Sequence, residues 1–99
     1  MQYNLELVRR IIESHLRSGN LCFITYRGLP EERVSTVSWT HDGDLLLWHD
    51  GDVVLGIPQS DELSLHEGAI HFRTASCTET LGTIQFFAPV NALSTGVDN

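Results

Sequence analysis

The 99-residue sequence contains no lysine, and its six basic residues are all arginines. Without a lysine the chain cannot form a Schiff base with a carbonyl substrate, and it cannot build a phosphate-binding P-loop, which requires one. No apolar stretch approaches the length that a transmembrane helix needs. The N-terminal residues lack the basic start and apolar run of a secretion signal. We therefore expect a cytoplasmic protein with no membrane partner.

Acidic residues outnumber basic ones, and the excess lies in one part of the chain. The formal net charge is −7. Residues 1–33 carry five arginines against four acids, a charge of +1, whereas residues 34–99 carry one arginine against nine acids, a charge of −8. Because phosphate backbones are bound by clustered cations, we expect no nucleic-acid partner. A basic protein partner is compatible with this charge.

The two cysteines show no pattern of chemical use. Cys22 and Cys77 lie in different predicted strands, and their spacing matches no zinc or redox motif. We therefore predict two reduced core thiols.

Residues 34–58 are the most informative segment, because the tetrapeptide His-Asp-Gly-Asp occurs there twice, at 41–44 and 49–52. Asp-Gly between strand-forming runs is a strong hairpin signal, so the segment predicts a three-stranded antiparallel meander with a two-residue turn at each end of its central strand. The two copies would then lie too far apart to hold one metal ion in one chain. Aspartate at these positions is explained by turn chemistry, and ligation of a metal by one copy is the alternative.

The predicted turns decide which meander side chains share a face. One face is predicted as core and includes Trp39 and Trp48, with the wall of an apolar ligand pocket as the alternative role for these two rings. The other face carries Leu45, Leu47 and Val54, which must also be covered, either by the later strands or by another copy of the protein. We predict a homodimer or higher oligomer whose interface includes these three residues. The predicted core face comprises Val37, Trp39, Leu46, Trp48, Val53, Leu55 and Ile57.

The remaining elements complete the expected fold. Asn4 as an N-cap and apolar residues at helical spacing predict a helix over residues 4–18. One helix followed by six or seven short strands predicts a single α+β domain over residues 1–99. Its N-terminal helix packs on a strongly bent, mainly antiparallel meander sheet or partial barrel. Strands are predicted at residues 21–27, 34–40, 45–48, 53–57, 62–66, 69–76 and 83–88, and residues 94–99 are expected to fray.

The two strands after the meander also support a register prediction. A turn at Glu67-Gly68 gathers Leu63, Leu65, Ile70 and Phe72 on one face. The opposite face then holds the best candidate site of the chain, namely Glu62, His66, His71 and Arg73. Glu62 would face Arg73, and the two histidines would be diagonal neighbours about 7–8 Å apart at Cα, near enough to share an ion or one ligand group. A solvated polar face without a ligand is the alternative.

Residues 5–55 also carry a pattern of helix, strand, loop and a strand leading to an Asp-Gly turn. This order resembles the start of the flavin-binding split-barrel oxidases. The chain departs from that family in having no identifying motif, no lysine and few arginines where a flavin phosphate would need them. We therefore expect no flavin, no other cofactor and no bound metal.

Function is predicted from these exclusions. No nucleophile elbow or other local catalytic signature is present, so no catalytic residue is assigned. We predict a small, acidic, non-enzymatic binding protein that acts as a homo-oligomer and recognises another protein or a small ligand. Compact acidic domains of this kind occur among inhibitors, immunity proteins and orphan products of phages and mobile elements. The alternative is a small metal-assisted enzyme built on the His66/His71 face.

Overall fold

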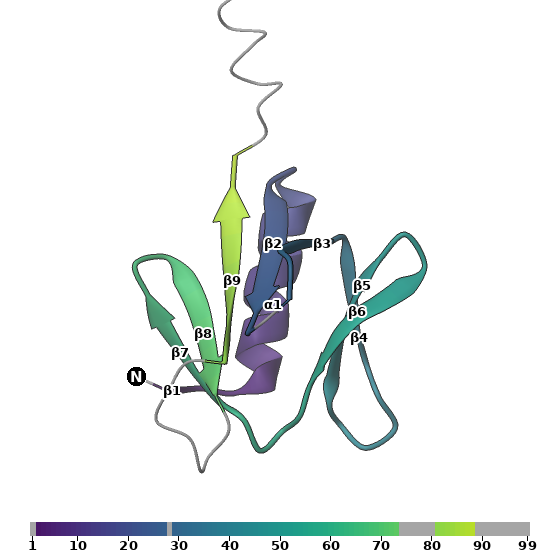
Figure 1. Cartoon of the computed structure of the whole chain (residues 1–99), viewed down its shortest axis with the longest axis vertical. Helices are drawn as coiled ribbons and strands as arrows, with labels where there is room; N and C mark the ends of the chain where they lie inside the picture. Colours follow the sequence, from purple (N-terminus) through teal and green to yellow (C-terminus); the bar gives the residue numbers. More distant parts are fainter. Residues whose placement is uncertain (1, 28, 74–80, 89–99) are drawn as a thin grey trace, which may run out of the picture.

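The structure, a computed structural model, describes residues 2–27, 29–73 and 81–88. These residues form one α-helix and nine strands in two antiparallel sheets, an α+β fold in which the sheets do not close into a barrel (Figure 1). No helix in this described part of the chain is long and apolar enough to cross a membrane. The end of the predicted strand 69–76, Cys77 and the tail 94–99 lie outside the described residues.

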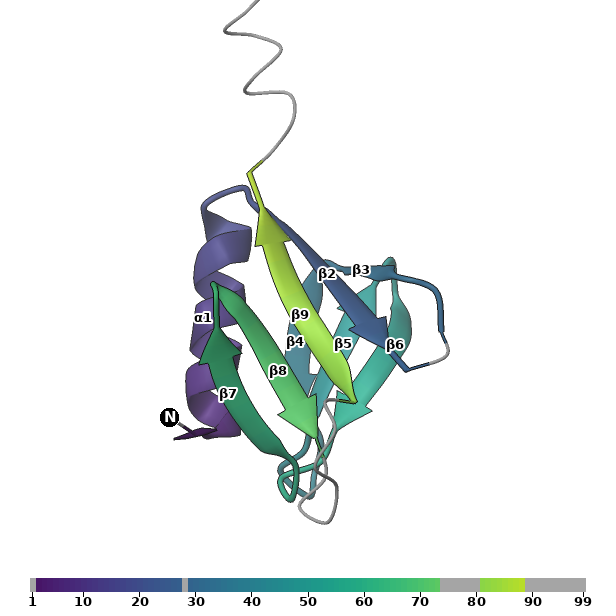
Figure 2. The same ribbon diagram turned by 60° about the vertical axis from the view of Figure 1, so that its left-hand side comes forward.

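The larger sheet has the strand order β1-β7-β8-β9-β2-β3, and the smaller sheet has the order β4-β5-β6. In Figure 2 the larger sheet lies in front, with the helix α1 at its side and the smaller sheet behind it. The bounds are β1 Gln2–Tyr3, α1 Leu5–Arg17, β2 Leu21–Tyr26, β3 Glu32–Val34, β4 Thr36–Trp39, β5 Leu45–His49, β6 Asp52–Ile57, β7 Glu62–His66, β8 Ala69–Arg73 and β9 Gly82–Phe87.

Helix α1 forms where the sequence pattern placed it. The Asn4 side chain caps it by accepting a hydrogen bond of 2.8 Å from the Leu7 backbone N–H, which satisfies one of the free donors of the first turn. The helix ends before Gly19, whose φ of 85° is a left-handed conformation that favours glycine. Its apolar stripe buries Leu5, Val8 and Ile12.

The two sheets are joined at Ser35, where the chain passes directly from one to the other. β3 pairs with β2 in the larger sheet, and β4 pairs with β5 in the smaller one. The Ser35 backbone N–H donates to the Trp48 carbonyl oxygen at 2.8 Å, so pairing continues across the bend. A single hydrophobic core therefore draws on the helix and both sheets. It contains Leu5, Val8, Ile12, Cys22, Ile24, Val34, Val37, Leu45, Leu47, Ile57, Leu63, Ile70, Phe72 and Ile84.

The β7–β8 hairpin has the predicted register, and this prediction is confirmed. Glu62 lies opposite Arg73, and Leu63 lies opposite Phe72. The connecting turn has two residues, Glu67 and Gly68, with φ values of 52° and 78°. Positive φ at both central positions is the geometry that matches the natural twist of paired strands, and here it is adopted even though glutamate is a poor residue for it.

The first turn of the meander differs from its prediction. The Thr40 backbone N–H donates to the Asp44 carbonyl oxygen, so three residues, 41–43, form the loop instead of two. Gly43 closes it with a φ of 89°. Three-residue hairpin loops of this kind require a residue in the left-handed conformation, and glycine provides it at the lowest cost. Consequently Trp39 pairs with Leu45, one residue away from the predicted partner.

The second turn is the predicted two-residue one, but the strands beyond it are not in the predicted register. Trp48 lies opposite Val53 as expected. The register then shifts, so that Leu47 faces Leu55 and Val54 is the extra residue of a β-bulge. A bulge moves every later residue of its strand to the other face, which a regular hairpin pattern does not anticipate.

These two shifts invert β5 relative to its neighbours, so that Leu45 and Leu47 join Val37 and Ile57, which lie in the core as predicted. Leu45 and Leu47 are completely buried, with 0% of each exposed, and Val54 is half-buried against the same core. Cover by the later strands or by another copy of the protein was predicted for these residues. The core within one chain already contains the two leucines, so the reason for placing an oligomer interface there does not hold, and the oligomeric state itself stays a prediction. The prediction that Trp39 and Trp48 share a core face is wrong, since neither ring is among the buried residues.

Candidate ligand-binding cleft and histidine surface

The two tryptophans lie in different surroundings. Trp48 is half-buried, and its indole N–H donates to the Ser38 hydroxyl at 2.8 Å. Trp39, at the end of β4, lies near the helix, where the Arg9 guanidinium carbon is 5.9 Å from the centre of the indole ring. Trp39 remains 40% exposed. The structure therefore separates the predicted pair and leaves one large aromatic side chain partly open to solvent.

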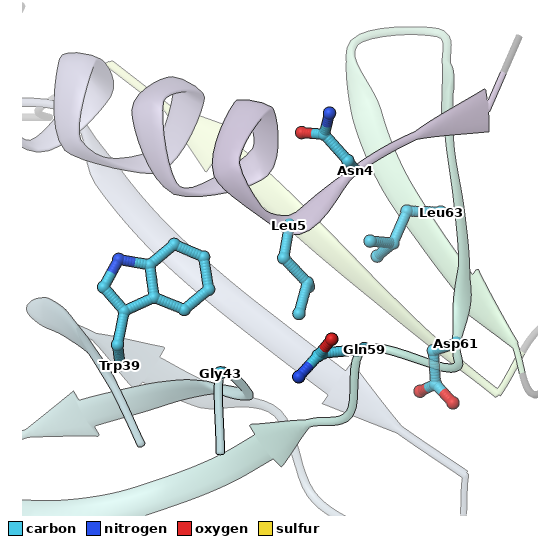
Figure 3. A pocket seen from close by; sticks show the side chains of 7 residues that line it. All are labelled: Asn4, Leu5, Trp39, Gly43, Gln59, Asp61 and Leu63. Atoms are coloured by element: carbon cyan, nitrogen blue, oxygen red, sulfur yellow. The ribbon is translucent and has the colours of Figure 1, made fainter. Parts of the chain in front are cut away.

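Trp39 lines a cleft with a volume of about 380 Å³ between the start of α1, the first meander turn and the start of β7 (Figure 3). In Figure 3 Trp39 and Asp61 lie at opposite ends of this cleft, with Leu5 and Gln59 between them. Of these four side chains, the apolar ones therefore lie towards the Trp39 end and the polar ones towards the Asp61 end. The lining residues are Asn4, Leu5, Trp39, Gly43, Gln59, Asp61 and Leu63.

Hydrogen bonds fix the floor of the cleft. The Gln59 side-chain amide donates to the Asp42 carbonyl oxygen, and the Gln59 backbone N–H donates to the Asp44 carboxylate at 3.1 Å. A Cβ at Gly43 would lie 2.6 Å from the Gln59 amide nitrogen, so only glycine allows this approach without displacing Gln59. These contacts tie the β6–β7 linker to the first meander turn, and the cleft is therefore formed in advance of any ligand.

Asp61 gives the cleft its electrostatic character. Partial burial raises the pKa of this carboxyl above its ordinary value, and the nearby negative charge of Asp44 adds to the effect. Within the described residues no arginine or histidine forms an ion pair with Asp61. Arg9, whose guanidinium lies over the Trp39 ring, is bound to Glu6 and Glu13 instead. A partly desolvated carboxylate without a cation would be stabilised by one.

The predicted polar face of the β7–β8 hairpin is present on the outer side of the larger sheet. The Arg73 guanidinium donates to the Glu62 carboxylate at 2.7 Å. The rings of His66 and His71 are 5.8 Å apart between centroids and inclined at 63°. His71 Nδ1 also lies 3.4 Å from the hydroxyl of Thr83 on β9. The four candidate residues therefore form two adjacent pairs, and the tryptophans lie elsewhere.

Two observations concern metal binding and cysteine reactivity. Among the described residues no three or more His, Cys, Asp or Glu side chains are placed to hold one metal ion together. Cys22 is buried in the core, and burial raises the pKa of its thiol to about 12. Since the thiolate is the reactive form of cysteine, Cys22 is a poor nucleophile.

The cleft residues were missed by sequence analysis apart from Trp39. Asn4 was assigned only as a helix cap, and Gln59 and Asp61 lay between two predicted strands with no role assigned. Three separate parts of the chain form the cleft, and no local periodicity encodes their meeting. The one signal in the sequence was Trp39, for which the wall of a ligand pocket was the alternative to a place in the core.

Comparisons with known proteins add no assignment to this geometry. No protein-family model, no curated protein and no solved structure matches the chain significantly.

Proposed function

We propose that this chain is a small acidic binding domain, not an enzyme, and that its Trp39 cleft takes a lysine or arginine side chain of a partner protein. One observation carries the proposal. A partly buried carboxylate, Asp61, has no cationic partner among the described residues and stands at one end of a cleft whose other end is an exposed indole ring.

The shape of the cleft suits a long basic side chain. Lysine and arginine combine an apolar stem with a charged head, and they bury the stem on apolar surface when the head reaches a polar partner. Leu5, Leu63 and Trp39 provide the apolar wall, and Asp61 provides the partner for the head. Tryptophan is also among the residues most enriched at the energetically important positions of protein interfaces.

The charge of the molecule favours the same partner. The formal net charge is −7, and the cleft carboxylate, Asp61, belongs to the strongly acidic region, residues 34–99. An excess of charge of one sign attracts partners of the opposite sign and accelerates their association. A basic protein surface is therefore favoured over a phosphate-rich ligand.

The homo-oligomer predicted from the sequence is not part of this proposal. It depended on leaving Leu45 and Leu47 uncovered, and both are core residues of a single chain. The cleft is lined by residues of one chain.

Tryptophan fluorescence tests the proposal. In a Trp48→Phe background Trp39 is the only tryptophan, so its emission reports on the cleft. The probes are N-acetylated, C-amidated pentapeptides with a central lysine or arginine between alanines, and the matched control replaces the basic residue with norleucine, which keeps the stem and removes the charge. We expect the basic peptides to change the Trp39 emission with saturation and the norleucine peptide to bind at least about tenfold more weakly, a difference of about 1.4 kcal/mol.

Two variants locate the charge effect. Asp61→Asn removes the carboxylate with little change of shape and should weaken basic-peptide binding by about tenfold, because hydrogen bonds to charged groups contribute about 1.5–3 kcal/mol. Asp52→Asn changes an exposed aspartate at the far meander turn and should leave binding unchanged. The proposal is refuted if lysine and norleucine peptides bind alike, or if neither binds at millimolar concentration.

A further inference from the structure

We propose that His66 and His71 form a two-histidine site for a divalent transition-metal ion, such as Zn²⁺ or Ni²⁺, on the outer face of the β7–β8 hairpin. This site is separate from the Trp39 cleft and does not depend on the proposed function. Imidazole nitrogen is a favoured ligand for these ions.

The separation of the two rings is close to the one that a shared ion requires. His66 and His71 are diagonal cross-strand neighbours, since Ser64 pairs with His71 and His66 pairs with Ala69. With metal–nitrogen bonds of about 2.0–2.1 Å, two imidazoles on one ion have centroids about 4.5–5.2 Å apart at tetrahedral or right-angled geometry. The observed centroid separation is 5.8 Å. A side-chain rotation that moves one ring by about 1 Å would therefore bring both histidines onto one ion.

The two histidines play different parts in that closure. His71 is half-buried and lies with its Nδ1 beside the Thr83 hydroxyl, which leaves its Nε2 as the nitrogen available to an ion. A hydrogen bond to the second ring nitrogen is the usual way in which a protein orients a metal-binding histidine. The His66 side chain is 72% exposed and can turn towards the ion without displacing the core.

The backbone under the site is held in place by the hairpin itself. The Glu62–Arg73 ion pair, at 2.7 Å, stands on the same face, and the tight turn at Glu67-Gly68 fixes the register at the other end. The two rings line, together with Ser64 and Leu65, a surface hollow of about 340 Å³, which leaves room for an ion and its water ligands. The Glu67 carboxylate lies 3.5 Å from His66 Nε2 and adds negative charge beside it.

Two protein ligands leave at least two coordination positions of the ion to water or to a ligand from solution. The site should therefore bind an exchangeable ion with modest affinity, and it should not be needed for folding. Because a histidine must be unprotonated to ligate a metal, acid should weaken the binding.

The test is a titration of untagged, metal-free protein with Zn²⁺ by calorimetry and with Ni²⁺ by NMR. We expect one ion per chain. His66→Asn and His71→Asn should each lower the affinity at least tenfold, while the matched control His41→Asn, at an exposed turn position, should leave it unchanged. Paramagnetic broadening by Ni²⁺ should centre on residues 64–71 and on Thr83.

Two results would overturn the inference: wild-type affinity in both single variants, or broadening centred away from the hairpin. The circular dichroism spectrum should be the same in all three variants, because both rings lie on the outer face of the sheet and outside the core. The peptide titrations of the Trp39 cleft use different residues, so each proposal can fail without the other.

Discussion

Gly82 is a position in the larger sheet where the packing leaves no room for a Cβ, and Gly82→Ala is our most specific prediction. Gly82 is buried in β9, opposite Phe72 on one side and Tyr26 on the other. A Cβ built there would lie 2.7 Å from Phe72 Cε1, even closer to Phe72 Cζ, and 2.8 Å from the Thr25 carbonyl oxygen. Side chains essentially never approach so closely, so either the Phe72 ring or the backbone must move.

The surroundings determine the size of the effect. The Phe72 ring is 2% exposed and stacks beside Tyr26 with centroids 6.1 Å apart, so it cannot retreat into solvent. Overpacking a core by one methyl group costs about 1–3 kcal/mol. Replacing glycine in a strand recovers about 0.5–1 kcal/mol of conformational entropy, which offsets only part of this cost. We expect a net destabilisation of about 1–2 kcal/mol, and a fall in Tm of about 4–15 °C for a domain of this size.

Thermal and urea unfolding followed by both tryptophan fluorescence and circular dichroism measure this effect, with coincident curves as the check on two-state behaviour. Gly56→Ala is the matched control, because its nearest neighbour would be the flexible end of Leu46 at 3.3 Å. We expect its change to stay within about 0.5 kcal/mol. Phe72→Leu in the Gly82→Ala background should cost less than Phe72→Leu alone, since the clash disappears with the ring. A Gly82→Ala protein as stable as wild type would refute the packing argument.

Two further predictions concern the corrected face and the cleft. Leu47→Asp should abolish the folded state at every protein concentration, because it places a charge in the core. Leu47→Ala should lower the free energy of unfolding by about 2–5 kcal/mol. If light scattering and circular dichroism instead show a wild-type oligomer and a folded Leu47→Asp monomer, the interface hypothesis is restored. Asp61→Asn should raise the Tm at pH 7 but not near pH 3. The raised pKa of Asp61 favours the protonated carboxyl in the folded state, so the stability that this group contributes is fully present below its unfolded pKa and is lost as the pH rises through its folded pKa. A change in Tm of the same size at both pH values would contradict this reasoning.

Local sequence patterns were enough to predict helix α1 and the β7–β8 hairpin, because both depend on residues close together in the chain. Asn4, the apolar spacing and Gly19 specify α1 because capping and amphipathicity act within a few turns of one helix. The β7–β8 register was predictable for a similar reason. One turn and one alternating pattern place Glu62 opposite Arg73, and the alternative registers would divide the apolar residues between two faces.

The meander shows where such reasoning fails. Its two turns carry the same tetrapeptide, yet one forms a three-residue loop and the other a two-residue turn. Both registers of the first hairpin offer an apolar face, since Leu45, Leu46 and Leu47 follow one another in the sequence. Local alternation cannot choose between them. The choice depends on which face meets the helix and the larger sheet, and the bulge at Val54 then adjusts β6 to that choice.

The sequence by itself thus determined the class of the fold, the helix and the hairpin that carries His66 and His71, because each is specified by residues close together in the chain. Only the tertiary structure decided that Leu45 and Leu47 are core, that Trp39 is partly exposed and that Asp61 shares a cleft with it. The sides of that cleft come from α1, the first meander turn and the β6–β7 linker, which are brought together by burial of one common core. Hydrophobic burial is non-directional, so its outcome depends on the whole set of packed surfaces and not on any one segment.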